Sequence, residues 1–178
     1  RVVGYSPVDL VRPSRGSGDT NLGNFVTDAL LWDTGADIAI YNNGGIRTSL
    51  PAGDITLGDL YAIEPFGNMT MTVELTKEQM EALFDHMAAL GGEQIAGGSY
   101  VVVDGRAQDV RVGGKPLEDR TYVVATNEFV AAGGDGYWMM AEGTNQQIYD
   151  VVRDTFVRFL EAHPDYVFES QGRITFGQ

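Results

Sequence analysis

Alternation of apolar and polar residues predicts several short strands. The clearest runs from Asn68 to Leu75, where methionine, valine and leucine alternate with threonine and glutamate, so we expect one apolar and one polar face. Val110–Leu117 is typical of a hairpin around Gly113-Gly114. The other predicted strands are a short segment from Val2 to Tyr5, Asp37–Tyr41, Ser99–Asp104, Arg120–Thr126 and an edge strand over 173–176.

Helical spacing of apolar residues predicts helices between these strands. The first is capped by Asp19 or Thr20 and ends at Gly35, and a short one runs from Thr56 to Ile63. A capping box, Thr76-x-x-Gln79, opens an amphipathic helix. The last helix ends at Pro164 and is expected to carry Ile148, Val151, Val152, Phe156 and Phe159.

The mixture of elements indicates an α+β fold. The chain has 178 residues, of which 43% are hydrophobic, and that is enough for one sizeable core. Helices and strands are interspersed, several strand pairs are expected to be antiparallel, and no repeat or linker is visible. We therefore expect a single domain over residues 1–178 that has a mixed β-sheet with packed helices.

Charge and composition exclude several functions. The formal net charge is −13, and so acidic a surface repels phosphate backbones, which argues against nucleic-acid partners. No apolar run approaches the roughly 18 residues that span a bilayer, so no membrane span is expected. No signal peptide is visible either. The absence of cysteine excludes disulfides and thiolate chemistry, and the start at Arg1 rather than methionine suggests an excised or processed chain.

The residue types that build a catalytic metal site are not grouped in the sequence. Its two histidines, His86 and His163, have no histidine or carboxylate partner at ligand spacing, so a structural role is expected for each. Neither a G-x-S-x-G turn nor a phosphate-binding Walker loop is present. We expect no metal or other cofactor and no catalytic residue in this chain.

Three loop clusters carry residues suited to ligand binding. Asn42-Asn43-Gly44-Gly45-Ile46-Arg47 follows a buried strand, where ligands tend to bind, and Arg47 is able to pair with a phosphate. Phe66, in Pro65-Phe66-Gly67-Asn68, is suited to stacking on a flat ring. Asp135 lies among glycines in the segment 127–137. Each cluster alone also fits a plain turn or a core aromatic residue.

The order of the motifs TNLGN, NNGGIR, ITLGDL, PFGN and NEFVAAGGDGY resembles the C-terminal domain of the 5'-nucleotidase family, especially bacterial periplasmic 5'-nucleotidase/UDP-sugar hydrolases. The resemblance covers the chain from about residue 10 to its end. It implies that Phe66 and Phe129 stack on both sides of a base, while Asp135 binds the ribose hydroxyls.

The resemblance also implies contacts to the rest of a nucleotide. Asn42 is expected to contact the base and Arg47 the phosphate. A second arginine precedes the TN-x-G motif in the family, and Arg15 is the best match here, with Arg12 as the alternative. For Asn21 and Asn24, within that motif, capping of the helix N-terminus is the expected role.

The family has a second, N-terminal metallophosphoesterase domain, which holds two divalent metal ions. Its D-x-H, G-D-x-x-D, N-H-E and G-H-x-H segments are absent, so this chain is expected to bind a nucleotide or nucleoside without hydrolysing it. The resemblance implies a parent enzyme, periplasmic or extracellular, that acts on nucleoside 5'-phosphates, UDP-sugars or cyclic nucleotides. The alternatives are a stand-alone nucleotide-binding module and a structural or adhesive surface domain.

Overall fold

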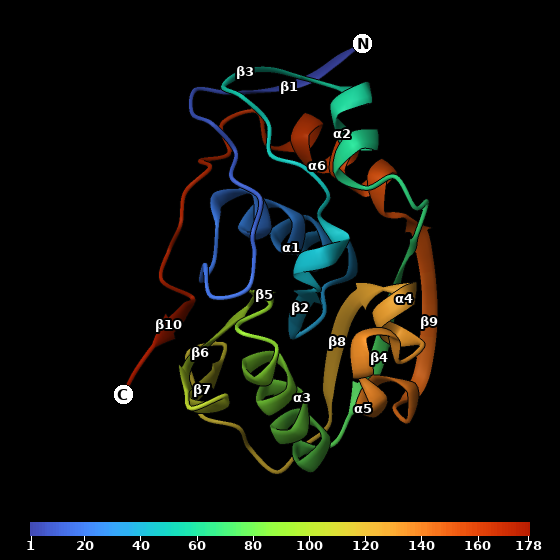
Figure 1. The fold of residues 1–178 in the computed structure, drawn as a ribbon. Coiled ribbons are helices and arrows are strands. Elements are labelled where there is room, and N and C mark those ends of the chain that lie inside the picture. The colour runs from blue at the N-terminus through green and yellow to red at the C-terminus, as the bar shows by residue number, and fades with distance from the viewer.

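A mixed five-stranded sheet lies at the centre of the computed structural model, which describes residues 1–178 (Figure 1). Both parallel and antiparallel neighbours occur in it, so the α+β prediction is confirmed. Its strands, in spatial order, are β5 (Gln94–Ala96), β2 (Ile38–Tyr41), β8 (Tyr122–Asn127), β4 (Met69–Leu75) and β9 (Thr144–Val151).

Helices cover both faces of this sheet. Helices α1 (Asn21–Thr34) and α6 (Val152–Ala162) lie on one side, and α3 (Lys77–Ala89) lies on the other (Figure 1). Side chains of β2 alternate between two hydrophobic cores because successive residues of a strand point to opposite faces. Ala39 and Tyr41 belong to the core that contains α1, and Ile38 and Ile40 to the core that contains α3.

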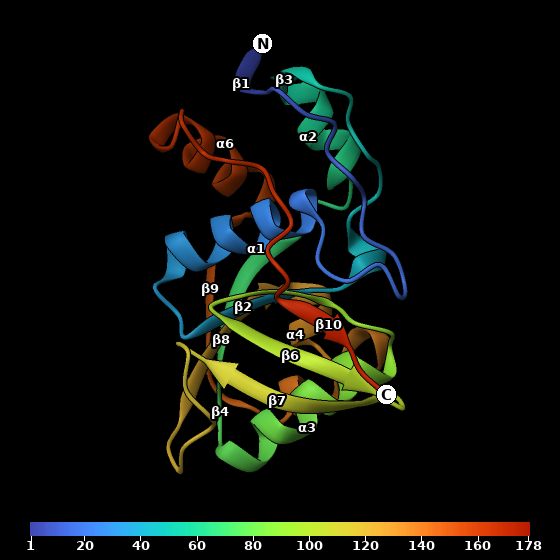
Figure 2. The ribbon, with the colours of Figure 1, turned by 90° about the vertical axis from the view of Figure 1, so that its left-hand side faces the viewer.

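Two smaller sheets complete the fold. A three-stranded sheet, in the order β10-β6-β7, packs against α3, and a two-stranded sheet lies near the N-terminus (Figure 2). The remaining elements are β1 (Val2–Ser6), β3 (Gly53–Thr56), α2 (Leu57–Ile63), β6 (Gly98–Val103), β7 (Arg106–Val112), α4 (Glu128–Ala131), α5 (Trp138–Ala141) and β10 (Ile174–Phe176). None of the helices combines the length and the apolar character that crossing a membrane requires.

The predicted ends of the first helix and the predicted starts of the next two helices are confirmed. The Thr20 side chain accepts a hydrogen bond from the Gly23 N–H at the start of α1, and Gly35 ends that helix in the left-handed conformation, with φ of 64°. Both Thr56 and Thr76 open capping boxes. The capping role expected for Asn21 and Asn24 is wrong, because their side chains bond to other loops, including the Val11 N–H and Asp19.

One helix prediction and one strand prediction need correction. Ile148 and Val151 lie in β9 rather than in the last helix, which begins at Val152, because pairing with β4 overrides a helical spacing of apolar residues. The hairpin expected over Val110–Leu117 is reduced to one bridge, Val112 to Lys115. Most of β7 pairs instead with β6.

The alternation in β4 is present, but its polar face is not exposed. Thr70 and Thr72 are buried, because α-helices cover both sides of the sheet and leave no solvent face for a central strand. The apolar face contributes Val73 and Leu75 to the core around α3, as the pattern predicts.

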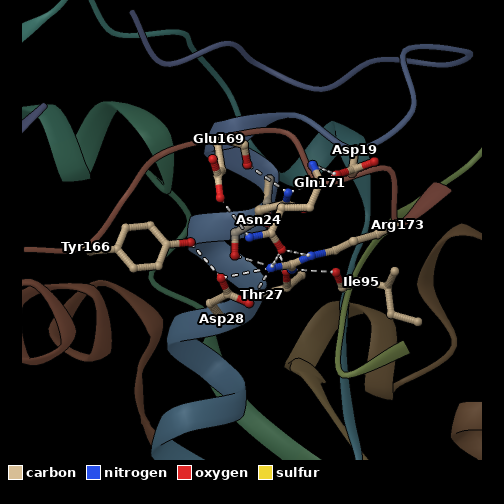
Figure 3. Close-up of polar contacts among 10 residues, drawn as sticks. Asp19, Asn24, Thr27, Asp28, Ile95, Tyr166, Glu169, Gln171 and Arg173 are labelled. Carbon is tan, nitrogen blue, oxygen red and sulfur yellow. Dashed lines mark hydrogen bonds and ion pairs between the residues drawn. The ribbon is translucent and has the colours of Figure 1, made fainter. Parts of the chain in front are cut away.

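A polar network fastens the C-terminal segment to α1 (Figure 3). Arg173 forms an ion pair of 2.9 Å with Asp28 and also donates to the Ile95 carbonyl, and Tyr166 donates to the same Asp28 at 2.6 Å. Asp19 accepts hydrogen bonds from the backbone N–H groups of Gln171 and Ile174. These bonds hold β10 parallel to β6.

We expect Arg173→Met to lower the free energy of unfolding by about 3 kcal/mol, because the change leaves a largely buried carboxylate, Asp28, without its cation. Urea unfolding at neutral pH measures the loss. The control is Arg106→Met, whose ion pair with Asp85 is exposed and should contribute less than about 1 kcal/mol. Equal losses for the two variants would refute this account of the network.

Candidate functional site

A cavity of about 360 Å³ opens at the edge of the central sheet where β2 and β8 end and β4 begins. Because β2 and β8 are parallel and β4 runs antiparallel to β8, the loop after β2, the loop after β8 and the loop before β4 meet there. This first cavity is lined by Asn42, Gly44, Gly45, Phe66, Asn68, Phe129 and Asp135. Four of the six residues predicted to bind a nucleotide therefore lie together: Asn42, Phe66, Phe129 and Asp135.

Two phenylalanine rings in this cavity are exposed. Phe66 is 60% exposed and Phe129 is 47% exposed, although phenylalanine is usually buried. Glycine makes room for the second ring, since a Cβ at Gly134 would lie 2.6 Å from ring atoms of Phe129. The Phe66 N–H donates to the buried Glu64 carboxylate at 2.8 Å, which fixes the loop before β4. Both rings are thus available to an apolar, flat ligand.

A chain of amide hydrogen bonds links the loops below the rings. Asn127 donates from Nδ2 to Asn42 Oδ1 at 3.0 Å, and Asn42 donates from its own Nδ2 to Asp135 Oδ2 at 3.1 Å. Asn127 also caps α4, because its Oδ1 accepts the Val130 N–H. This chain aligns the Asp135 carboxylate with the first cavity.

The backbone at Asp135 has an uncommon conformation. Its φ is 56°, in the left-handed region that few residues other than glycine, asparagine and aspartate adopt, and Gly133 and Gly136 on either side also have positive φ. His86 on α3 donates from Nε2 to the Asp135 carbonyl at 2.8 Å. The histidine therefore has a structural contact in this site, and the glycines allow the turn that presents the carboxylate.

A second cavity, of about 530 Å³, adjoins the first and shares Gly44 and Asp135 with it. Both arginines considered for a phosphate, Arg12 and Arg15, line it. Arg47 lines neither cavity: it is exposed, and its guanidinium donates to the Gly44 carbonyl at 3.1 Å. The structure thus brings two of the three arginines to one place.

Glu93 also lines the second cavity, and it carries the most perturbed carboxyl group there. Burial raises the pKa of Glu93 to about 7, and the negative charge of Asp135 adds to the increase. Hydrogen bonds donated by the Asn43 N–H and the Tyr137 hydroxyl oppose the increase. Near neutral pH this carboxyl group therefore changes its charge at the wall of the second cavity.

Sequence reasoning missed Asn68 and Glu93 as residues of the site. Asn68 closes the PFGN motif, so its position beside Phe66 was a usable signal for a cavity residue. Nothing in the sequence marked Glu93, which follows two glycines and resembles any charged residue of a turn.

No group of three or more histidine, cysteine, aspartate or glutamate side chains in the chain is arranged to hold a metal ion. The residues present do not fit a dimetal site. What the two cavities offer instead is stacking surface, hydrogen-bond acceptors and guanidinium groups.

The fold is a mixed sheet with two adjoining cavities at one edge, and comparison with known proteins gives the family of the chain. The family model described as "5'-nucleotidase, C-terminal domain" matches residues 2–142. The chain therefore belongs to the family of 5'-nucleotidase C-terminal domains, as the motif order predicted.

Relatives in sequence and structure agree with this family. The chain is 37% identical to the trifunctional nucleotide phosphoesterase protein YfkN of Bacillus subtilis over 80% of its own length and 11% of that protein. It is 39% identical to a 5'-nucleotidase of Vibrio cholerae, over 66% of the chain and 22% of the relative. A solved 5'-nucleotidase precursor from Thermus thermophilus matches 99% of the chain and 39% of the solved chain, with 30% identity and a TM-score of 0.91.

The raised pKa of Glu93 predicts a pH dependence of stability. Its folded value of about 7 exceeds the ordinary value of 4.5, so between these pH values the folded state keeps a proton that the unfolded state loses. The stabilisation is complete below about pH 4.5 and disappears as the pH rises through about 7. We expect the unfolding free energy of the wild type, relative to Glu93→Gln, to fall by about 3 kcal/mol across this range.

Urea unfolding of both proteins at several pH values measures this difference, in which the other titrating groups cancel. A difference that stays constant with pH would show that Glu93 has the same affinity for protons in the folded and unfolded states.

Proposed function

We propose that the chain is the nucleotide-recognition domain of a 5'-nucleotidase-type metallophosphoesterase that hydrolyses nucleoside 5'-phosphates. The observation that carries the proposal is the first cavity, where two exposed aromatic rings and a carboxylate from different loops converge. Its volume of about 360 Å³ falls within the range of small-ligand pockets. The family membership supports the same ligand class.

In this proposal the base stacks between Phe66 and Phe129, and Asp135 accepts hydrogen bonds from the ribose hydroxyls. Each stack contributes about 1–3 kcal/mol and tolerates any base, because every base has a π-face. A hydrogen bond to a charged acceptor contributes about 1.5–3 kcal/mol. Asn42 and Asn68 offer amide groups to the edge of the base.

The phosphate then extends into the second cavity, toward Arg12 and Arg15. Arg47 remains a proposed phosphate contact at the rim, since its guanidinium bonds to the carbonyl of Gly44, which lines both cavities. Exposed guanidinium groups are screened by solvent, and the net charge of −13 opposes an anion, so the phosphate adds little affinity in this chain alone.

Hydrolysis in this proposal belongs to a separate N-terminal domain of a longer polypeptide, which holds two divalent metal ions. The chain spans only 11% to 22% of the curated relatives described above, so the rest of such an enzyme would lie outside these residues. The resemblance to bacterial periplasmic enzymes supports a periplasmic or extracellular location. UDP-sugars are a further substrate class that the resemblance suggests.

We expect adenosine and AMP to bind the chain with similar dissociation constants, on the order of 0.1–10 mM, once ordering costs are subtracted. Phe129→Ala should weaken adenosine binding at least about fivefold through loss of one stack. Arg47→Ala should have a smaller effect on the binding of either ligand. NMR titration with adenosine and AMP measures the dissociation constants of the wild type, Phe129→Ala and Arg47→Ala.

The matched control is Phe176→Ala, because Phe176 is 49% exposed, about as much as Phe129, and lies on β10. This variant should bind adenosine like the wild type. AMP binding at least tenfold tighter than adenosine would overturn the claim that the phosphate adds little affinity in this chain alone. Equal losses in the two phenylalanine variants would overturn the stacking role.

A further inference from the structure

Glu93 is a buried carboxylate that no cation neutralises. It is 4% exposed, it precedes β5, and none of the ion pairs in the chain includes it. Burial of an unpaired carboxylate is unfavourable unless hydrogen bonds satisfy its oxygens. Its hydrogen-bond partners therefore indicate what this residue does.

The two oxygens of Glu93 bond to two different loops. Oε2 accepts the backbone N–H of Asn43 at 2.7 Å, and Oε1 accepts the hydroxyl of Tyr137 at 2.8 Å. Asn43 belongs to the segment Asn42–Gly45, here the Asn42 loop, and Tyr137 to Gly133–Tyr137, here the Asp135 loop. One side chain thus bridges both loops that supply polar groups to the first cavity.

The same loops meet a second time at the cavity surface. Asn42, next to Asn43, donates to the carboxylate of Asp135, which lies two residues before Tyr137. The Asp135 end of this contact is exposed, whereas Asn42, Asn43, Glu93 and Tyr137 are all buried. The buried bridge can therefore persist while the surface contact exchanges for a ligand hydroxyl.

Residues beside Glu93 fix the Asn42 loop further. Gln94 donates to Asn43 Oδ1 at 3.1 Å, and Asn43 donates from Nδ2 to the Gly92 carbonyl at 3.0 Å. Gln94 reaches this position because Gly23 in the TNLGN motif has no side chain, and a Cβ there would collide with the Gln94 amide. The Asn42 loop is thus fixed to the start of β5, and Glu93 extends that connection to the Asp135 loop.

We propose that Glu93 is a positioning residue that holds the Asn42 loop and the Asp135 loop in the relative placement a nucleoside requires. The inference rests on the proposed function for its ligand. Glu93 itself does not contact the base or the ribose in this account. It acts through the Asn43 N–H and the Tyr137 hydroxyl, and it keeps Asn42 and Asp135 within hydrogen-bond distance of each other.

The test compares Glu93→Gln, Tyr137→Phe and the double variant with the wild type, by amide NMR spectra and adenosine titration. Glutamine keeps the size of glutamate but has an NH₂ group in place of one carboxylate oxygen, so one of the two hydrogen bonds is lost or has its direction reversed. Tyr137→Phe removes one hydroxyl and keeps the ring. The Tyr137→Phe variant still tests the bridge between the loops if Glu93→Gln folds poorly.

In the ligand-free chain, Tyr137→Phe should shift the amide resonance of Asn43, and Glu93→Gln should shift amide resonances in both loops. Adenosine affinity should fall about 3- to 10-fold in each single variant, and the double variant should bind no more weakly than the weaker single one. The control is Asp19→Asn, a buried carboxylate that bonds the C-terminal segment. It should lower the melting temperature and leave adenosine affinity within about twofold.

Shifts confined to one loop, or additive losses in the double variant, would overturn the positioning role. The positioning role would also be overturned if Glu93→Gln kept the wild-type affinity for adenosine, or if Asp19→Asn weakened adenosine binding as much as Glu93→Gln does. A wild-type chain that binds no adenosine refutes the proposed function instead, and the ligand-free amide shifts still decide whether Glu93 couples the loops.

Discussion

The parallel pairing of β2 with β8 is the constraint on which the site depends. Parallel neighbours end at the same edge of a sheet, so Asn42 and the loop after Asn127 are brought together although they are far apart in the sequence. The antiparallel partner β4 begins at that edge and adds Phe66 and Asn68 from the loop before it. The strand order thus brings together three sequence motifs, none of which is distinctive alone, so that their loops line one cavity.

Buried polar groups, rather than the walls of the cavity, fix the loops once the sheet has placed them. Glu64 accepts a hydrogen bond from the Phe66 N–H, and Asn127 donates one to the Asn42 side chain. Glu93 bridges the Asn42 loop and the Asp135 loop. Such groups must be hydrogen-bonded because an unsatisfied buried donor or acceptor costs about 1–3 kcal/mol. These hydrogen bonds therefore restrict the conformations of the loops around the first cavity.

Local signals made most helices and the central strands predictable, whereas long-range pairing did not follow from them. Capping residues at Thr20, Thr56 and Thr76 fix helix starts through short-range hydrogen bonds. The assignment of Ile148 to a helix failed because only β4, some 75 residues earlier, makes its segment a strand. Motif order pointed to four residues that line the first cavity, Asn42, Phe66, Phe129 and Asp135, whereas the role of Glu93 became visible only in the folded chain, where it is buried between loops.

The most direct test of the account is an isotope-filtered NOE spectrum of the labelled chain with adenosine. If the base occupies the first cavity, its protons should show NOEs to the ring protons of both Phe66 and Phe129. NOEs to only one of these rings, or to residues outside the cavity, would contradict the claim that the two rings enclose the base.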